Sequence, residues 1–217
     1  MSDNPIKVYP GEQAQVAWDG RLCIHVGECG RATNQLFEGG RNPWCQPDLV
    51  DLDAVADVVR RCPTGALTYQ LADGSAPEQA PARNRVVVTN NGPLYLTGEL
   101  AIDGASEDMT GVKFRAALCR CGQSNNKPFC DNSHEQAGFR DRGAVGDAGT
   151  TLPSSGGLLE IRRAKNGPLL VSGNLTIVAG SGREAWQGTR TALCRCGHSA
   201  NKPFCDGAHK AAGFIAD

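Results

Sequence analysis

Short runs of alternating apolar and polar residues, interrupted by Gly and Pro, make up most of the chain. Residues 6–9 and 15–18 alternate in this way on either side of Pro10-Gly11, a pattern that predicts a β-hairpin. Similar runs predict further short strands, at residues 66–70, 86–88, 94–96, 100–102 and 115–118.

One stretch has the spacing of an amphipathic helix. Its apolar residues are one to three positions apart and share one side, at Leu52, Val55, Val58 and Val59. Asp51 or Asp53 can cap its N-terminus, and the positive charge of Arg60-Arg61 suits its C-terminus. Many short strands with one clear helix predict an α+β fold in which strands predominate.

The C-terminal two thirds of the chain contain a sequence repeat with an offset of 75 residues. Asn91-Gly92-Pro93-Leu94 returns as Asn166-Gly167-Pro168-Leu169, and the register holds through to the end of the chain. A constant register indicates a duplicated structural unit. We therefore divide the chain into an N-terminal unit, a first repeat and a second repeat, separated by two linkers. Their bounds are residues 1–70, 85–140 and 158–217, with linkers at 71–84 and 141–157.

Each repeat contains three cysteines and one histidine with the spacing Cys-x-Cys-x8-Cys-x3-His. These are Cys119, Cys121, Cys130 and His134, and then Cys194, Cys196, Cys205 and His209. Thiolate and imidazole suit both zinc and iron–sulfur clusters, so the spacing leaves the two kinds of site open. Disulfides explain the pattern less well, because the two cysteines of Cys-x-Cys are too close to bridge comfortably.

This stretch resembles the CDGSH iron–sulfur domain of the mitoNEET family. The second copy matches the family's closing pattern with Cys205-Asp206-Gly207-Ala208-His209. The first copy departs from it at Asn132, which stands where the family has Gly, and Asn tolerates a positive φ. The resemblance implies a [2Fe–2S] cluster in each repeat, held by three Cys and one His.

The resemblance also carries an expectation about assembly. Members of the family with one motif form homodimers in which two β-rich protomers share a core. We therefore expect the two repeats to pack as a pseudo-dimer within one chain, and the protein to be a monomer. Each repeat has few apolar residues of its own, which favours a shared core.

The N-terminal unit contains a second kind of cysteine pattern. Cys62-Pro63 follows an upstream Cys-x5-Cys pair at Cys23 and Cys29. The ending Cys-Pro-x-Gly-Ala-Leu and the loop Asn42-Pro43-Trp44 resemble the divergent single-cluster ferredoxin domain that is often joined to CDGSH domains. The resemblance implies a small ferredoxin-like domain with one cubane-type cluster.

One ligand of the usual four-iron ferredoxin pattern is missing. Val26 stands at the central cysteine position and cannot bind iron. The three thiolates Cys23, Cys29 and Cys62 suit a [3Fe–4S] cluster. A [4Fe–4S] cluster needs a fourth donor, for which Cys45 and His25 are the candidates.

Polar residues beside the repeat ligands have simpler interpretations. Arg120 and Arg195 lie between paired ligands and can be solvated surface charges as readily as residues that tune a cluster. Asp131 and Asp206 directly follow a ligand and can cap the next turn or orient the histidine; capping is the simpler role.

Composition narrows the classes of function. The chain has 217 residues and a formal net charge of −1, which gives no electrostatic basis for a nucleic-acid partner. We find no apolar run of about 18 residues and no signal-peptide core, so we expect no membrane association and a cytoplasmic location. Ten cysteines in a reducing compartment favour metal binding over disulfides.

The motifs point to a carrier and not to an enzyme. The sequence contains no nucleotide-binding loop, nucleophile motif or flavin fingerprint. We therefore expect electron transfer with a protein redox partner. The alternative is cluster storage, cluster transfer to an apo-protein acceptor, or redox or pH sensing, since a histidine ligand can be protonated and released.

Overall fold

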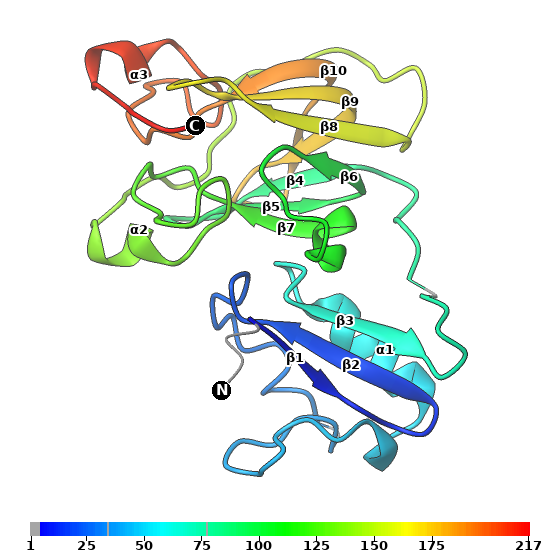
Figure 1. Cartoon of the computed structure of the whole chain (residues 1–217). Helices are drawn as coiled ribbons and strands as arrows, with labels where there is room; N and C mark the ends of the chain where they lie inside the picture. The colour runs from blue at the N-terminus through cyan, green and yellow to red at the C-terminus, as the bar shows by residue number, and fades with distance from the viewer. Residues whose placement is uncertain (1–4, 34, 77) are drawn as a thin grey trace.

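The computed structural model describes residues 5–33, 35–76 and 78–217. Within these residues the chain forms two β-sheets with a few short helices (Figure 1). The predicted α+β class with predominant strands is therefore confirmed. None of the helices in the described ranges has both the length and the apolar character that crossing a bilayer requires.

The N-terminal unit is a three-stranded antiparallel sheet with one helix. β1 (Ile6–Tyr9) and β2 (Ala14–Asp19) form the predicted hairpin, and β3 (Leu67–Leu71) pairs with the other edge of β2. The helix α1 (Leu52–Arg61) packs on this sheet through its valine side, and the long connection before it contains the short 3-10 helix η1 (Pro47–Leu49).

The ends of α1 follow the sequence signals. The side chain of Asp51 accepts a hydrogen bond from the N–H of Ala54 at 2.8 Å, which satisfies one free donor of the first turn. Arg60 and Arg61 occupy the last turn, where positive charge is favourable. Of the two predicted candidates, Asp51 and Asp53, the N-cap of α1 is therefore Asp51.

The two repeats supply strands at matching positions. The first repeat provides β4 (Arg85–Val88), β5 (Leu94–Thr97), β6 (Glu99–Ile102) and β7 (Arg115–Leu118). The second provides β8 (Leu158–Arg163), β9 (Leu169–Val178) and β10 (Glu184–Leu193), of which β9 spans the positions of both β5 and β6. Short helices complete them: η2 (Thr110–Lys113), α2 (Ser133–Gln136) and α3 (Ala208–Ala211).

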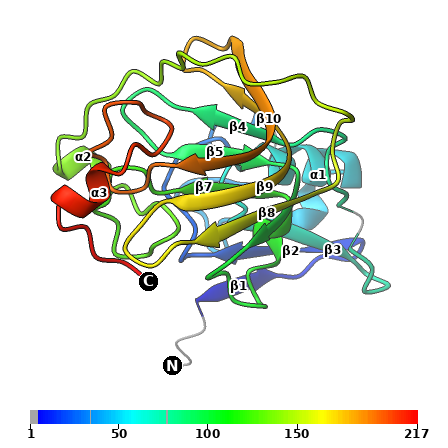
Figure 2. The ribbon, with the colours of Figure 1, turned by 90° about the horizontal axis from the view of Figure 1, so that it is seen from above.

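The seven strands of the repeats form one sheet in which the repeats exchange strands (Figure 2). β4 pairs in parallel with the end of β9, and β6 pairs in parallel with β8. The two pairings are equivalent under the 75-residue offset, because β8 corresponds to β4 and the end of β9 corresponds to β6. Each repeat therefore completes the sheet of the other.

A single apolar core lies between the strands of the two repeats. Fully buried side chains from both copies contact one another in it, among them Val86, Leu94, Leu96, Leu159, Leu169 and Ile177. The N-terminal unit has a core of its own, but its residues Leu22 and Ala66 are buried in the core of the repeats. Neither repeat encloses a core by itself.

Both segments with linker composition are packed against the domains. Val145 is buried in the core of the repeats, and Gly149 forms an isolated parallel bridge with Gln187. Glu78 forms an ion pair with Arg115 of β7, and both side chains are 7% exposed. The segments join the units but also contribute contacts to the fold.

Candidate metal centres

The ligand sets of the two repeats lie in loops at one end of the shared sheet. In the first repeat, Cys119 and Cys121 follow β7, and His134 lies in α2. The second repeat repeats this arrangement after β10, with His209 in α3. Figure 1 shows α3 above α2 on the same side of the molecule.

Within each set, the four ligands form two close pairs. Sγ of Cys119 lies 3.6 Å from Sγ of Cys121, and Sγ of Cys130 lies 3.5 Å from Nδ1 of His134. The equivalent distances in the second repeat are 3.6 Å and 3.4 Å. Metal bonds of about 2.3 Å to sulfur and 2.0 Å to nitrogen place two tetrahedral ligands ~3.8 Å apart for two sulfurs and ~3.5 Å apart for sulfur and nitrogen. Each pair thus has the spacing of two ligands on one metal.

The two pairs of a set do not converge on one point. Among the residues that the structure describes, no three Cys, His, Asp or Glu side chains are placed to hold a single ion. A mononuclear zinc site needs its four donors around one ion. The geometry of three thiols and an imidazole in two pairs fits a binuclear group better.

Backbone N–H groups point at the sulfurs. Those of Gln123 and Asn132 lie 3.4 Å from the Sγ atoms of Cys121 and Cys130, and the second repeat has the same contacts. A hydrogen bond from the Cys121 thiol lowers the pKa of Cys119 to about 6, although burial opposes this shift. Burial raises the pKa of Cys130 to about 12, so this sulfur ionises at neutral pH only with a metal bound to it.

The turn before each histidine has a left-handed backbone. Asn132 has a φ of 69° and Gly207 a φ of 90°, so Asn replaces Gly in the first repeat without loss of the turn, as expected. Asp131 accepts hydrogen bonds from the N–H groups of Ser133 and Asn125, at 3.0 and 2.8 Å. Asp206 makes the counterpart contacts with Ala208 and Ala200. Each aspartate thus accepts an N–H of the following turn, while the N-cap positions of the two short helices are Asn132 and Gly207.

The surface interpretation of Arg120 and Arg195 is wrong. Both residues are 2% exposed. Nε of Arg120 donates to the carbonyl of Gly92 at 2.8 Å, and Nε of Arg195 donates to that of Gly167 at 2.7 Å. Each guanidinium therefore ties the Cys-x-Cys loop to the Asn-Gly-Pro turn of its repeat. The only sign of this buried role in the sequence is that the arginine and the Asn-Gly-Pro turn both recur in the second repeat.

The two ligand loops touch each other. Cys121 and Cys196 form an isolated antiparallel bridge. A Cβ atom at Gly122 would lie 2.6 Å from the carbonyl oxygen of Cys196, and one at Gly197 would lie 2.6 Å from that of Cys121. Both positions require glycine, because the two backbones lie too close together for a side chain and because the φ values are 83° at Gly122 and 86° at Gly197.

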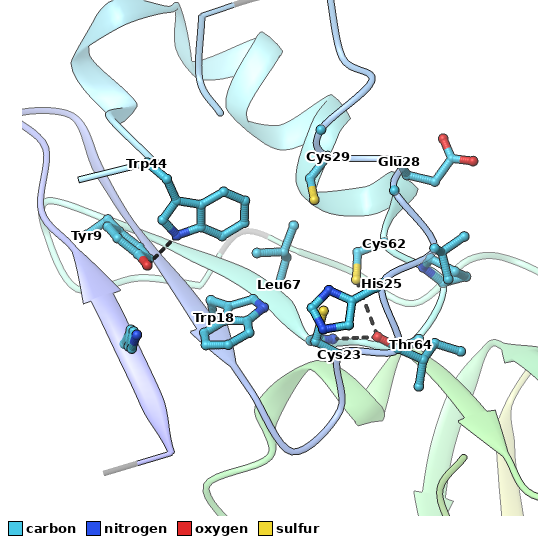
Figure 3. Close-up of a pocket in the computed structure, with 17 residues that line it drawn as sticks. Tyr9, Trp18, Cys23, His25, Glu28, Cys29, Trp44, Cys62, Thr64 and Leu67 are labelled. Atoms are coloured by element: carbon cyan, nitrogen blue, oxygen red, sulfur yellow. Dashed lines mark hydrogen bonds between the residues drawn. The ribbon is translucent and has the colours of Figure 1, made fainter. Parts of the chain in front are cut away.

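The N-terminal unit brings its three predicted ligands to one cavity. Cys23, Cys29 and Cys62 line a space of about 500 Å³ and face it in Figure 3. Burial, followed by the nearby Cys62 and Cys23 thiols, raises the pKa of Cys29. The cavity is much larger than a single ion requires, and its apolar wall includes Trp18 and Trp44.

The two candidates for a fourth donor are placed differently. His25 lines the same cavity as Cys23 and Cys62, and Figure 3 labels it among the residues that surround this space. Cys45 is 1% exposed and lines a separate hollow of the unit, where it pairs with Phe37 through the backbone. Of the two, only His25 is positioned at the ligand cavity.

Comparisons with known proteins agree with this division of the chain. Residues 91–135 and 166–210 match the family described as "Iron-binding zinc finger CDGSH type", and residues 9–72 match the family described as "Divergent 4Fe-4S mono-cluster". The chain is also similar to two proteins named "Uncharacterized protein YjdI", from Escherichia coli strain K12 and Escherichia coli O157:H7. The alignment with each is 40% identical over 70 residues, which are 32% of this chain and 92% of the relative. No solved structure gives a match. The chain thus contains two tandem domains of the CDGSH family, preceded by a domain of the divergent 4Fe-4S mono-cluster family.

Proposed function

We propose that the protein is a multi-cluster electron carrier and not an enzyme. In each CDGSH repeat the three cysteines and the histidine hold one [2Fe–2S] cluster, with one ligand pair on each iron. Such clusters supply one-electron oxidation and reduction when bound. The observation that carries the proposal is the division of each ligand set into two pairs with the spacing of ligands on one metal.

In the N-terminal unit we propose a cubane-type cluster on Cys23, Cys29 and Cys62. Three thiols around one cavity support a [3Fe–4S] cluster. The four-iron description of the matched family and the position of His25 at the cavity support a [4Fe–4S] cluster. Iron analysis distinguishes the two forms, and a His25→Ala variant that keeps its iron content excludes the histidine as a ligand.

We propose further that the two repeats are an intrachain counterpart of a homodimer and that the protein is a cytoplasmic monomer. The reciprocal pairing of β4 with β9 and of β6 with β8 supports this, as does the common core. Sedimentation equilibrium should give a mass near 22.9 kDa. A stable dimer at micromolar concentration would contradict the proposal.

The test of function is anaerobic purification of the full chain with metal analysis, visible absorbance and electron paramagnetic resonance. We expect a coloured protein that accepts electrons from dithionite and returns them to a mild oxidant over repeated cycles. Its physiological partner would be another redox protein. A colourless protein that contains zinc, or colour that is lost in the first cycle, would refute electron transfer.

A second function is favoured by one difference between the repeats. In the first repeat Cys130 is 3% and His134 is 9% exposed, whereas Cys205 and His209 of the second are partly exposed. A cluster at the second repeat is therefore more accessible to an apo-protein acceptor. Incubation with an apo-ferredoxin separates the functions, because a donor loses its [2Fe–2S] absorbance to the acceptor and a carrier retains it.

A further inference from the structure

The N-terminal unit contacts the first repeat at its ligand set. Nδ2 of Asn132 donates to the carbonyl of Ile24 at 2.7 Å, and Nδ2 of Asn126 donates to that of Arg21 at 2.7 Å. Ile24 is 6% exposed and belongs to the same small apolar cluster as Cys130 and Ala117. The residue that follows one N-terminal ligand, Cys23, therefore lies at the ligand loop of the first repeat.

Tyr95 lies at the same contact. Its ring packs on the group formed by Ile24 and Cys130, and it lines a hollow of about 440 Å³ together with Asn132 and His134. Tyr95 thus lies where the ligand loop of the first repeat meets the N-terminal unit.

Backbone contacts hold the two units close together beside this point. A Cβ atom at Gly65 would lie 2.7 Å from the carbonyl carbon of Gly111, so only glycine permits this approach. Nε of Arg115 donates to the carbonyl of Cys62 at 2.8 Å, and Arg21 pairs with Asp108 at 3.0 Å. These contacts fix the N-terminal ligands relative to the first repeat.

The second repeat lacks the counterpart of this contact. Leu170 and Gly207 occupy the positions of Tyr95 and Asn132, and Leu170 is 46% exposed. Figure 1 shows the first repeat between the N-terminal unit and the second repeat. The ligand loops of the repeats meet at the bridge of Cys121 with Cys196. The three ligand sets therefore lie in a series with the first repeat in the middle.

We propose that this series is an intramolecular electron relay, in which Ile24, Tyr95 and Asn132 couple the N-terminal site to the first repeat. The inference rests on the proposed electron-carrier function. One electron moves at each step, so one site is oxidised and the next is reduced by the same electron, and no bond forms or breaks. The external donor and acceptor are one-electron redox proteins.

The exposed ends of the series are where these redox proteins would dock. Val26 beside the N-terminal cavity is 43% exposed, and the ligands Cys205 and His209 of the second repeat are partly exposed. The middle site is less exposed, with Cys130 at 3% and His134 at 9% and the N-terminal unit against it. In the relay, an electron therefore reaches the first repeat through one of its neighbours.

The first test is electron paramagnetic resonance of the dithionite-reduced full chain, with signals assigned by Cys130→Ser and Cys205→Ser. We expect the first-repeat signal to be broadened by magnetic interaction with the N-terminal site. Cys62→Ser, which removes an N-terminal ligand, should abolish that broadening and leave the second-repeat signal unchanged. Equal effects on the two repeats, or none on the first, would overturn the relay.

The second test exchanges residues between equivalent positions and so avoids removing any ligand. Tyr95→Leu with Asn132→Gly gives the first repeat the residues of the second. Leu170→Tyr with Gly207→Asn is the matched control, because Leu170 is 46% exposed and the contacts of the N-terminal unit described above are made with the first repeat. In stopped-flow reduction, we expect slower electron exchange between the N-terminal site and the first repeat in the first variant, and the wild-type rate in the control.

The outcomes separate the relay from the function on which it rests. If no site accepts and returns electrons, the proposed carrier function fails and the relay fails with it. If all sites cycle reversibly but Tyr95→Leu with Asn132→Gly exchanges electrons at the wild-type rate, the carrier function stands. In that case the Ile24–Tyr95 contact is not the route, and the relay across it is overturned.

Discussion

Arg115 reaches from β7 of the first repeat into the N-terminal unit, and its replacement by alanine tests how firmly the two are joined. Nε donates to the carbonyl of Cys62 at 2.8 Å and Nη2 to that of Leu67 at 3.1 Å. The guanidinium also pairs with the carboxylate of Glu78, and both side chains are 7% exposed. Arg115→Ala therefore removes two hydrogen bonds and leaves a buried carboxylate without its partner.

The size of the effect follows from the burial of this group. Hydrogen bonds to a charged group contribute about 1.5–3 kcal/mol each, and removing one member of a buried ion pair costs about 3–5 kcal/mol. The two ranges describe the same guanidinium and are not added. We expect Arg115→Ala to lower the free energy of unfolding by about 3–5 kcal/mol. Adding Glu78→Gln should recover part of the loss, because it removes the unpaired charge.

The assay is urea unfolding of the anaerobic full chain, followed by tryptophan fluorescence and by visible absorbance. Arg190→Ala is the matched control, since Arg190 holds the equivalent position in the second repeat and is exposed. We expect the control to change stability by no more than about 0.5 kcal/mol. Arg115→Ala should also weaken the N-terminal absorbance, because the Cys62 backbone loses its anchor. Similar small changes in both variants would refute the reasoning.

Three further predictions concern the ligand loops. Val26→Cys supplies the missing thiolate beside the cavity and should raise the iron bound by the N-terminal unit toward four; unchanged iron would show that this position does not reach the cluster. Gly122→Ala should destabilise the chain more than Gly182→Ala, since both glycines have positive φ but only Gly122 has a carbonyl 2.6 Å from the added Cβ; denaturant midpoints measure this, and equal losses would exclude the clash. On lowering the pH from about 8 to 5, the second repeat should lose its absorbance before the first. Burial lowers the pKa of His134, so this ligand of the first repeat is protonated only at lower pH, whereas His209 of the second repeat is partly exposed. His209→Cys should slow the faster phase of bleaching, and bleaching as fast as in wild type would exclude protonation of this ligand as the release step.

The candidate ligand sets and the local elements could be predicted from the sequence because their signals are local. The spacing from Cys119 to His134 recurs with a constant offset, and the Asp51 cap and the valines of α1 lie within one helix. The same is true of the hairpin around Pro10-Gly11. Each of these features is determined by residues that are close together along the chain.

Features that depend on distant contacts could not be predicted in this way. The sequence around an arginine between two ligands does not indicate whether its side chain is solvated or buried. Tertiary packing leaves Arg120 only 2% exposed and places it against the carbonyl of Gly92. Cys45 could be a ligand or a core residue, and its position depends on a backbone pairing with Phe37. The docking of the N-terminal unit joins segments about a hundred residues apart, such as Ile24 and Asn132, and has no local signal.

The two repeats differ where the N-terminal unit contacts the first of them. At the left-handed turn position, Asn132 replaces the glycine that has the least strain at positive φ, as found at Gly207. The strain is small for Asn and is offset by a hydrogen bond to Ile24 that glycine cannot make. Tyr95 and the buried Arg115 likewise contact the N-terminal unit, whereas their counterparts in the second repeat are exposed. The first repeat therefore carries side chains suited to a neighbour inside the chain, and the second keeps the equivalent surface free.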